Sequence, residues 1–126
     1  MSGADWVPTS FFPGKGREAA ALRDGALAFD IAAARKRLAD PGGYEIVLDT
    51  PTVEIGVYVL VAPEPDRQQP HADDEVYIVL EGEGVLTVEG RELPMREGAA
   101  VFVPAGADHR FTAYVELAVL VIFAKH

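Results

Sequence analysis

One stretch decides the fold of this chain: residues 68–82, which read QQPHADDEVYIVLEG. Three residues separate His71 from Glu75, and six separate Glu75 from Gly82. The second half is rich in Val, Ile and Tyr and ends at a glycine, which is typical of a β-strand that runs into a turn. Side chains two positions apart share one face of a strand, so Glu75 would point into the core with Val79. A carboxylate placed there is costly unless it is paired, hydrogen-bonded or bound to a metal ion.

A second stretch, residues 98–109, reads GAAVFVPAGADH and ends on His109. Two neutral imidazoles and one carboxylate are a natural ligand set for a divalent cation. The two stretches together therefore predict a metal site formed by His71, Glu75 and His109.

Composition limits the class of protein. The chain has 126 residues, of which 49% are apolar and 25% charged, an ordinary mixture for one globular domain. Acidic residues outnumber basic ones 20 to 11 and the net charge is −9, which argues against nucleic acid and anionic membranes as partners. The absence of cysteine excludes disulfides, thiolate metal ligands and cysteine nucleophiles.

Residues at the N-terminal end do not resemble a secretory signal peptide. Residues 1–8 lack the basic start and apolar run of a signal peptide, and the longest apolar stretch, 117–124, is too short to span a bilayer. We therefore expect a cytoplasmic protein. Residues 1–28 show no period and are interpreted as an irregular arm, whose aromatic side chains either pack on the domain surface or cover a partner subunit. Those side chains are Trp6, Phe11 and Phe12.

One helix is expected, over residues 30–40. Asp30 is a good N-cap, the interior is rich in alanine, and Pro41 ends the pattern. The helix would lie against a sheet through a single apolar face. That face consists of Ile31, Ala34 and Leu38.

From Tyr44 on, short runs rich in Val, Ile and Tyr alternate with turn residues, which predicts an all-β sandwich or barrel. We place a single domain at 29–126, with its barrel core at 53–124. The expected strands lie near 44–49, 53–62, 67–71, 75–81, 84–89, 99–103, 109–114 and 116–124.

The two stretches resemble the two motifs of the cupin family. The first cupin motif runs Gly, five residues, His-X-His, three or four residues, Glu, six residues, Gly; its second histidine, glutamate and closing glycine are matched by His71, Glu75 and Gly82. The second runs Gly, five residues, Pro-X-Gly, two residues, His, three residues, Asn; it is matched by Gly98, Pro104, Gly106 and His109. The resemblance implies a double-stranded β-helix, or jelly-roll barrel, with one short N-terminal helix.

Three positions depart from the family pattern. Gln69 stands where the first histidine is usual, Pro63 replaces the leading glycine, and Ala113 replaces the final asparagine. A register with His71 as first histidine and Asp73 as second leaves only one residue before the glutamate and is rejected. Gln69 could supply an amide oxygen, orient a bound water, or leave its position to solvent.

The resemblance implies one divalent metal ion, which could be iron, manganese, nickel or zinc. With one histidine fewer than usual, the remaining set is similar to the two-histidine, one-carboxylate triad of non-haem iron oxygenases, which has open positions. The alternative is a degenerate cupin with weakened metal binding. There, His71 and Glu75 would pair with each other, or His71 would act as a general base.

The family resemblance favours a metalloenzyme that acts on a small organic molecule inside the barrel, first as a dioxygenase, then as an isomerase, epimerase or lyase. Gln69 and Tyr77 are the candidates for the pocket wall. The alternative is a non-catalytic cupin that binds a small molecule and whose metal site is degenerate or structural. An exposed sheet edge and the N-terminal arm suggest a homodimer.

Overall fold

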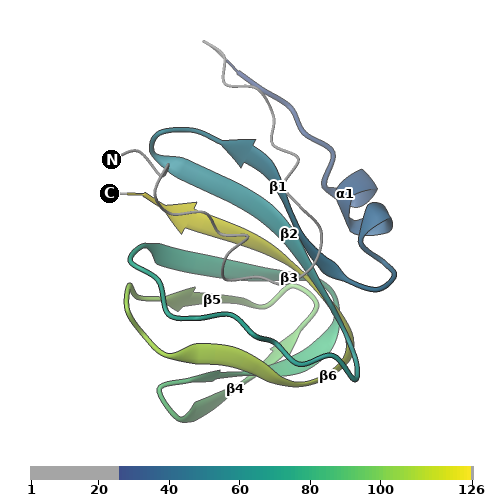
Figure 1. Cartoon of the computed structure of the whole chain (residues 1–126), viewed down its shortest axis with the longest axis vertical. Coiled ribbons are helices and arrows are strands. Elements are labelled where there is room, and N and C mark those ends of the chain that lie inside the picture. Colours follow the sequence, from purple (N-terminus) through teal and green to yellow (C-terminus); the bar gives the residue numbers. More distant parts are fainter. Residues whose placement is uncertain (1–25, 126) are drawn as a thin grey trace.

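Two long strands organise the sheet. The computed structural model describes residues 26–125, and in it β3 (Asp74–Val88) and β6 (His109–Ala124) run antiparallel along almost their whole length (Figure 1). On the other side of β6 lies β2 (Val53–Val61), which also pairs with β1 (Gly43–Asp49). The free side of β3 pairs with β5 (Ala100–Val103) near its beginning and with β4 (Arg91–Arg96) near its end.

The β3–β6 pair is bent by breaks in its register. These fall between Val79 and Glu81, Gly82 and Gly84, and Val85 and Leu86. Such bulges bend a strand and increase its twist. Gly82 has a φ of 92°, a left-handed conformation that favours glycine. The bend folds the sheet around one interior, and the expected all-β jelly-roll fold is confirmed.

Alternate side chains of the strands form two apolar clusters on opposite faces of the sheet. The inner cluster fills the barrel, and the outer cluster lies under the helix α1 (Ile31–Arg37). In β2, Tyr58 and Leu60 point inward, whereas Val57 and Val59 point toward α1. This division follows from the two-residue period of a strand.

The helix covers the outside of β1 and β2 (Figure 1). Asp30 caps it as expected, because its Oδ1 accepts a hydrogen bond of 3.0 Å from the Ala33 amide. Ala34 and Leu38 are buried, as the helical pattern predicted. The helix ends earlier than expected, at Arg37, whose guanidinium donates to both carboxylate oxygens of the buried Glu45. This ion pair fixes the end of α1 to β1.

Some strand boundaries differ from those expected. No strand forms at 67–71, because Pro70 has no amide hydrogen and the buried positions there do not alternate. The two strands expected on either side of Gly82-Glu83-Gly84 are one continuous strand, and so are those expected at 109–114 and 116–124. The sequence pattern also missed β4, which contains Pro94.

Candidate metal centre

The candidate ligands come from the beginnings of the two long strands. Glu75 is the second residue of β3, His71 lies in the loop before it, and His109 is the first residue of β6. The Nδ1 atom of His71 lies 3.0 Å from the Asp73 carbonyl oxygen, and that of His109 lies 2.8 Å from the Ala107 carbonyl oxygen. Because a carbonyl oxygen only accepts, Nδ1 carries the hydrogen in both rings. A neutral imidazole held this way presents the lone pair of its Nε2 atom, as metal-binding histidines do.

The three side chains converge inside the barrel. One possible ligand atom from each lies within 4.8 Å of the others. The Oε1 atom of Glu75 is 2.6 Å from the Nε2 atom of His71 and 3.1 Å from that of His109. All three residues are buried, with Glu75 completely inaccessible. The expected inward orientation of Glu75 is therefore confirmed, and the structure brings His71, Glu75 and His109 together.

The chemistry of this cluster fits a cation. Among residues 26–125, the buried Glu75 Oε2 atom has no hydrogen-bond partner, and the His109 Nε2 atom faces the Glu75 Oε1 atom at 3.1 Å. Neutral imidazoles in the tautomer described above turn lone pairs toward a carboxylate that also offers only lone pairs. A buried group of acceptors is stable when a proton or a cation lies among them, and a divalent metal ion satisfies all three. His71, Glu75 and His109 can thus hold a metal ion.

The two imidazole rings favour the ionised form of Glu75. Burial by itself would raise the pKa of Glu75, but the interactions with the His109 and His71 rings outweigh it and lower that pKa. Burial would lower the pKa of His109, but the neighbouring Glu75 carboxylate raises it. Glu75 is therefore kept as a carboxylate, the form that binds metal ions.

The two predicted pocket residues lie in different places. Tyr77 is buried, with its ring centroid 6.0 Å from that of His109, and its hydroxyl donates a hydrogen bond of 2.7 Å to Gln68 Oε1. Gln69, the possible fourth ligand, is exposed, unlike the three buried residues of the cluster. The strand expected near 67–71, which would have turned Gln69 to the same face as His71, does not form.

Two buried polar residues near the cluster, Gln68 and Asp66, were not predicted. Asp66 accepts hydrogen bonds from Gln68, from the Tyr58 hydroxyl and from the Phe111 amide. The segment has irregular backbone, so no periodic pattern marked these residues as inward-facing. A Pro-rich loop that closes over a barrel nevertheless needs such polar anchors, since its buried backbone groups require partners.

Aromatic side chains wall the cluster. The Phe123 ring is 4.8 Å from the His71 ring, and the Phe111 ring is 5.0 Å from the Tyr77 ring, measured between centroids. Phe123 pairs with Glu75 on one side and with Glu54 of β2 on the other. Glu54 is a second buried carboxylate that faces the interior and accepts a hydrogen bond of 3.0 Å from the Tyr44 hydroxyl.

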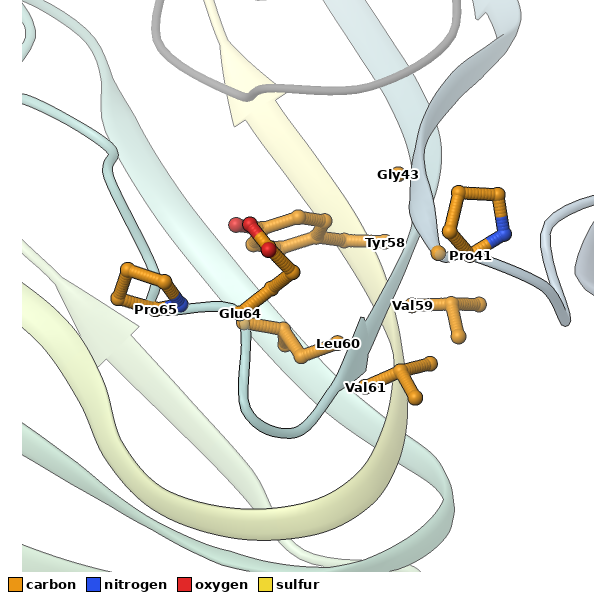
Figure 2. A pocket seen from close by; sticks show the side chains of 9 residues that line it. Pro41, Gly43, Tyr58, Val59, Leu60, Val61, Glu64 and Pro65 are labelled. Carbon is orange, nitrogen blue, oxygen red and sulfur yellow. The ribbon is translucent and has the colours of Figure 1, made fainter.

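A hollow of about 280 Å³ lies outside this cluster. It is bordered by Pro41 and Gly43 at the beginning of β1 and by the loop of Glu64 and Pro65 (Figure 2). Tyr58 lines this hollow, and its hydroxyl donates a hydrogen bond to Asp66. None of the three candidate metal ligands lines this hollow, so it is separate from the metal centre.

The buried tyrosines allow a prediction about ionisation in alkaline solution. Burial, followed by neighbouring carboxylates, raises the pKa of Tyr44, Tyr58 and Tyr77. A pKa raised in the folded state stabilises the protein below pH ~10, the ordinary pKa of tyrosine, and this stabilisation is lost as the pH rises further. We expect these three phenols to ionise only when the chain unfolds. Phenolate absorbance and circular dichroism should therefore change together; ionisation of these phenols around pH 10 in folded protein would contradict the buried hydrogen bonds.

Comparison with known proteins places the chain in a family. The family model of the cupin domain matches residues 57–123. An uncharacterized protein of Streptomyces coelicolor is 40% identical over 90 residues, which cover 71% of this chain and 86% of that protein. The dimethylsulfoniopropionate lyase DddW of Ruegeria pomeroyi is 37% identical over 43 residues, 34% of this chain and 28% of the lyase. The crystal structure of FeII HppE is 26% identical, with a TM-score of 0.57, and the match covers 65% of this chain and 49% of that one.

No helix within residues 26–125 is long and apolar enough to cross a membrane. The family match spans more than half of the chain and contains the whole His71, Glu75 and His109 cluster. Sequence, topology and site geometry agree, and the chain belongs to the cupin family.

Proposed function

We propose that this chain is a metalloenzyme that holds one divalent metal ion between His71, Glu75 and His109 and acts on a small organic molecule inside the barrel. The first candidate for its activity is an iron(II)-dependent dioxygenase. The observation that carries the proposal is the convergence of two Nε2 lone pairs and one carboxylate in a buried site.

The number of ligands supports an enzyme rather than a closed structural site. Among the His, Cys, Asp and Glu side chains of the described residues, the cluster consists of two histidines and one carboxylate. Structural metal sites are commonly closed by four protein ligands, whereas catalytic sites keep positions for water or substrate. When bound, a divalent metal supplies Lewis-acid chemistry and, as iron(II), dioxygen activation.

The surrounding side chains suit a small substrate. Phe123 packs against the His71 ring and excludes water from that side of the cluster, which strengthens electrostatic interactions there. Tyr77 and the pair of Tyr44 and Glu54 add polar groups to an otherwise apolar interior. Such an interior, with few polar groups at fixed places, orients a ligand by directed hydrogen bonds.

The comparisons support iron and offer a second candidate. FeII HppE, 26% identical in the matched region, is named as an iron(II) protein, which favours iron(II) here. The identity of 37% to the lyase DddW over 43 residues favours a lyase as the second candidate. Dependence on dioxygen separates the two, because a dioxygenase consumes dioxygen and an elimination does not.

Nitric oxide tests for a site with open positions. The protein is loaded with iron(II) without oxygen and exposed to nitric oxide, and electron paramagnetic resonance is recorded. We expect the half-integer-spin signal of an iron(II)–nitric oxide complex, because the proposed triad leaves positions for an added ligand. His109→Ala should lose the signal, whereas Gln69→Ala should keep it, because Gln69 is exposed.

Other outcomes would redirect the proposal. Iron that binds tightly but gives no nitric oxide signal would indicate a closed structural site in a small-molecule-binding cupin. Loss of the signal in Gln69→Ala would make Gln69 a ligand after all. An isomerase or epimerase activity, the homodimer and the cytoplasmic location remain predictions.

A further inference from the structure

We propose that a second copy of this chain packs face to face on the outer side of the sheet, over the part of β3, β5 and β6 that α1 leaves uncovered. Five apolar residues define this surface, which is called the outer patch. They are Val76, Ile78, Ala100, Phe102 and Ile122. The inference does not rest on the proposed function, because it concerns the opposite face of the strands and is tested on metal-free protein.

Two rows of apolar side chains cross the outer face of the sheet. Residues that are directly paired between antiparallel strands lie on the same face, so the register of β2, β6, β3 and β5 defines each row. In that order of strands, one row is Ile55, Ile122, Val76 and Phe102, and the other is Val57, Leu120, Ile78 and Ala100. No polar or charged side chain interrupts either row.

The helix covers one end of these rows, on β2 (Figure 1). Val57 is completely buried in the outer cluster under α1, whereas Phe102, on β5, is 58% exposed. Val76, Ile78 and Ile122 are half-buried and belong to neither apolar cluster. An antiparallel sheet with one face in water commonly carries polar side chains on that face. The apolar rows are therefore typical of a face with a second layer across its whole width, of which α1 supplies only a part.

The outer patch lies directly behind the candidate metal centre. Successive residues of a strand point to opposite faces of the sheet. Val76 follows Glu75 in β3, and Ile122 precedes Phe123, whose ring packs on the ring of His71. A second layer over the patch would thus support the strands that carry Glu75 and Phe123.

The charge of the chain favours a second copy as this layer. The net charge is −9, so two copies repel each other wherever their acidic surfaces meet. None of the residues in the two rows is charged, and contact through them buries no charge. A two-fold interface also needs a surface that is complementary to itself, and a flat apolar patch meets this need.

The thickness of α1 fits a sheet as its neighbour in the second layer. Stacked sheets lie about 10 Å apart, and a helix with its side chains is about 10–12 Å across. A partner's sheet on the outer patch would therefore lie at the same height as α1. With the two-fold axis parallel to the strands, α1 of each copy would flank the β5 edge of the other, and the two would form one continuous layer.

The size of the patch indicates a weak dimer. Three strands about 4.8 Å apart, with about four residues each at about 3.3 Å per residue, give a planar area of roughly 200 Å². A standard interface buries about 800 Å² on each partner. Contacts between α1 and the β5 edge would add to the patch, and we expect an interface at the small end of the range. Such a dimer should dissociate at micromolar concentrations.

Sedimentation velocity of metal-free, full-length protein tests the dimer. From low micromolar to millimolar concentration, the wild type should change from monomer to dimer. Phe102→Glu places a charge in the contact, and we expect association at least about tenfold weaker. Val115→Glu is the matched control and should associate like the wild type. Val115 is also a large apolar side chain, 82% exposed, but it borders a different hollow, beside Tyr114 and Met95.

Thiol labelling tests which surface is covered. The chain has no cysteine, so an introduced cysteine is the only thiol. The reactivity of Ala100→Cys should fall as the protein concentration rises and the dimer forms. Ala113→Cys is the control, because Ala113 is also exposed but lies in another part of β6, outside the two rows. Its reactivity should be independent of concentration.

Three outcomes would overturn the inference. The first is wild-type protein that stays monomeric at every concentration; a protected thiol in monomeric Ala100→Cys would then assign the cover to residues 1–25 instead. The second is a dimer that persists unchanged in Phe102→Glu, because it would form through another surface. The third is a dimer in which the Ala100→Cys thiol stays fully reactive. The metal content of the protein decides the proposed function separately, because the patch contains no candidate ligand.

Discussion

Replacement of Glu75 by alanine is expected to abolish metal binding. Wild-type protein purified without chelator should contain roughly one divalent ion per chain, and Glu75→Ala essentially none. Glu75 supplies the only carboxylate of the cluster, and its Oε1 atom lies between the Nε2 atoms of His71 and His109. Without it, two neutral imidazoles would face a cation whose charge no ligand of the cluster balances. Elemental analysis of the two proteins measures the difference.

Glu54→Gln is the control for this experiment. It changes a carboxylate that is equally buried in the same barrel but belongs to β2, which is separated from β3 by β6. We expect this variant to retain its metal ion. Metal content that is unchanged in Glu75→Ala, in protein shown to be folded by circular dichroism, would rule out the assigned site. Loss of metal from both variants would indicate a general requirement for negative charge in the barrel.

The substitution Gly82→Ala is expected to destabilise the fold by roughly 3–5 kcal/mol. A Cβ atom at this position would lie 2.2 Å from the carbonyl oxygen of Glu116, a backbone atom of the paired strand. The backbone of Gly82 also has a φ of 92°, which a side chain strains. The bend of the β3–β6 pair would have to change, and urea denaturation followed by circular dichroism measures the free energy of unfolding.

Comparison with Gly90→Ala separates the effect of the clash with Glu116 from the effect of backbone strain. Gly90 has a φ of 81°, but within the described part of the chain nothing lies within 4 Å of a Cβ built there. It therefore keeps the backbone strain and lacks the clash, and we expect a loss of about 1–2 kcal/mol. Equal losses in the two variants would show that the contact with Glu116 does not constrain the bend.

The candidate ligands could be predicted because their spacing is local. The distances along the sequence from His71 to Glu75 and from Gly98 to His109 match the two cupin motifs, and this resemblance identified both halves of the site. The two-residue period of a strand predicted that Glu75 points inside. The helix was predicted for a similar reason, since its cap and its apolar face are encoded within one short segment.

The incorrect predictions concern segments in which the local sequence pattern and the tertiary structure disagree. Glycines that usually end a strand are bulges inside β3, because the partner strand continues past them. In the loop before β3, Pro70 interrupts alternation, so the buried glutamine is Gln68 and not Gln69. Burial at these positions depends on how Asp66 is bonded to Phe111, 45 residues away, and no local period contains that information.

The bend in the β3–β6 pair makes the metal centre a reporter on folding. Glu75 is paired with Phe123 near one end of the ladder, whereas His109 is paired with Val88 near the other. Along an extended strand, positions 75 and 88 would be roughly 43 Å apart, yet the ligand atoms of Glu75 and His109 meet. Any partly unfolded form in which the ladder straightens, or β6 detaches, separates the ligands. The spectrum of a cobalt(II)-loaded sample would therefore follow the integrity of the β3–β6 pairing, without any added label.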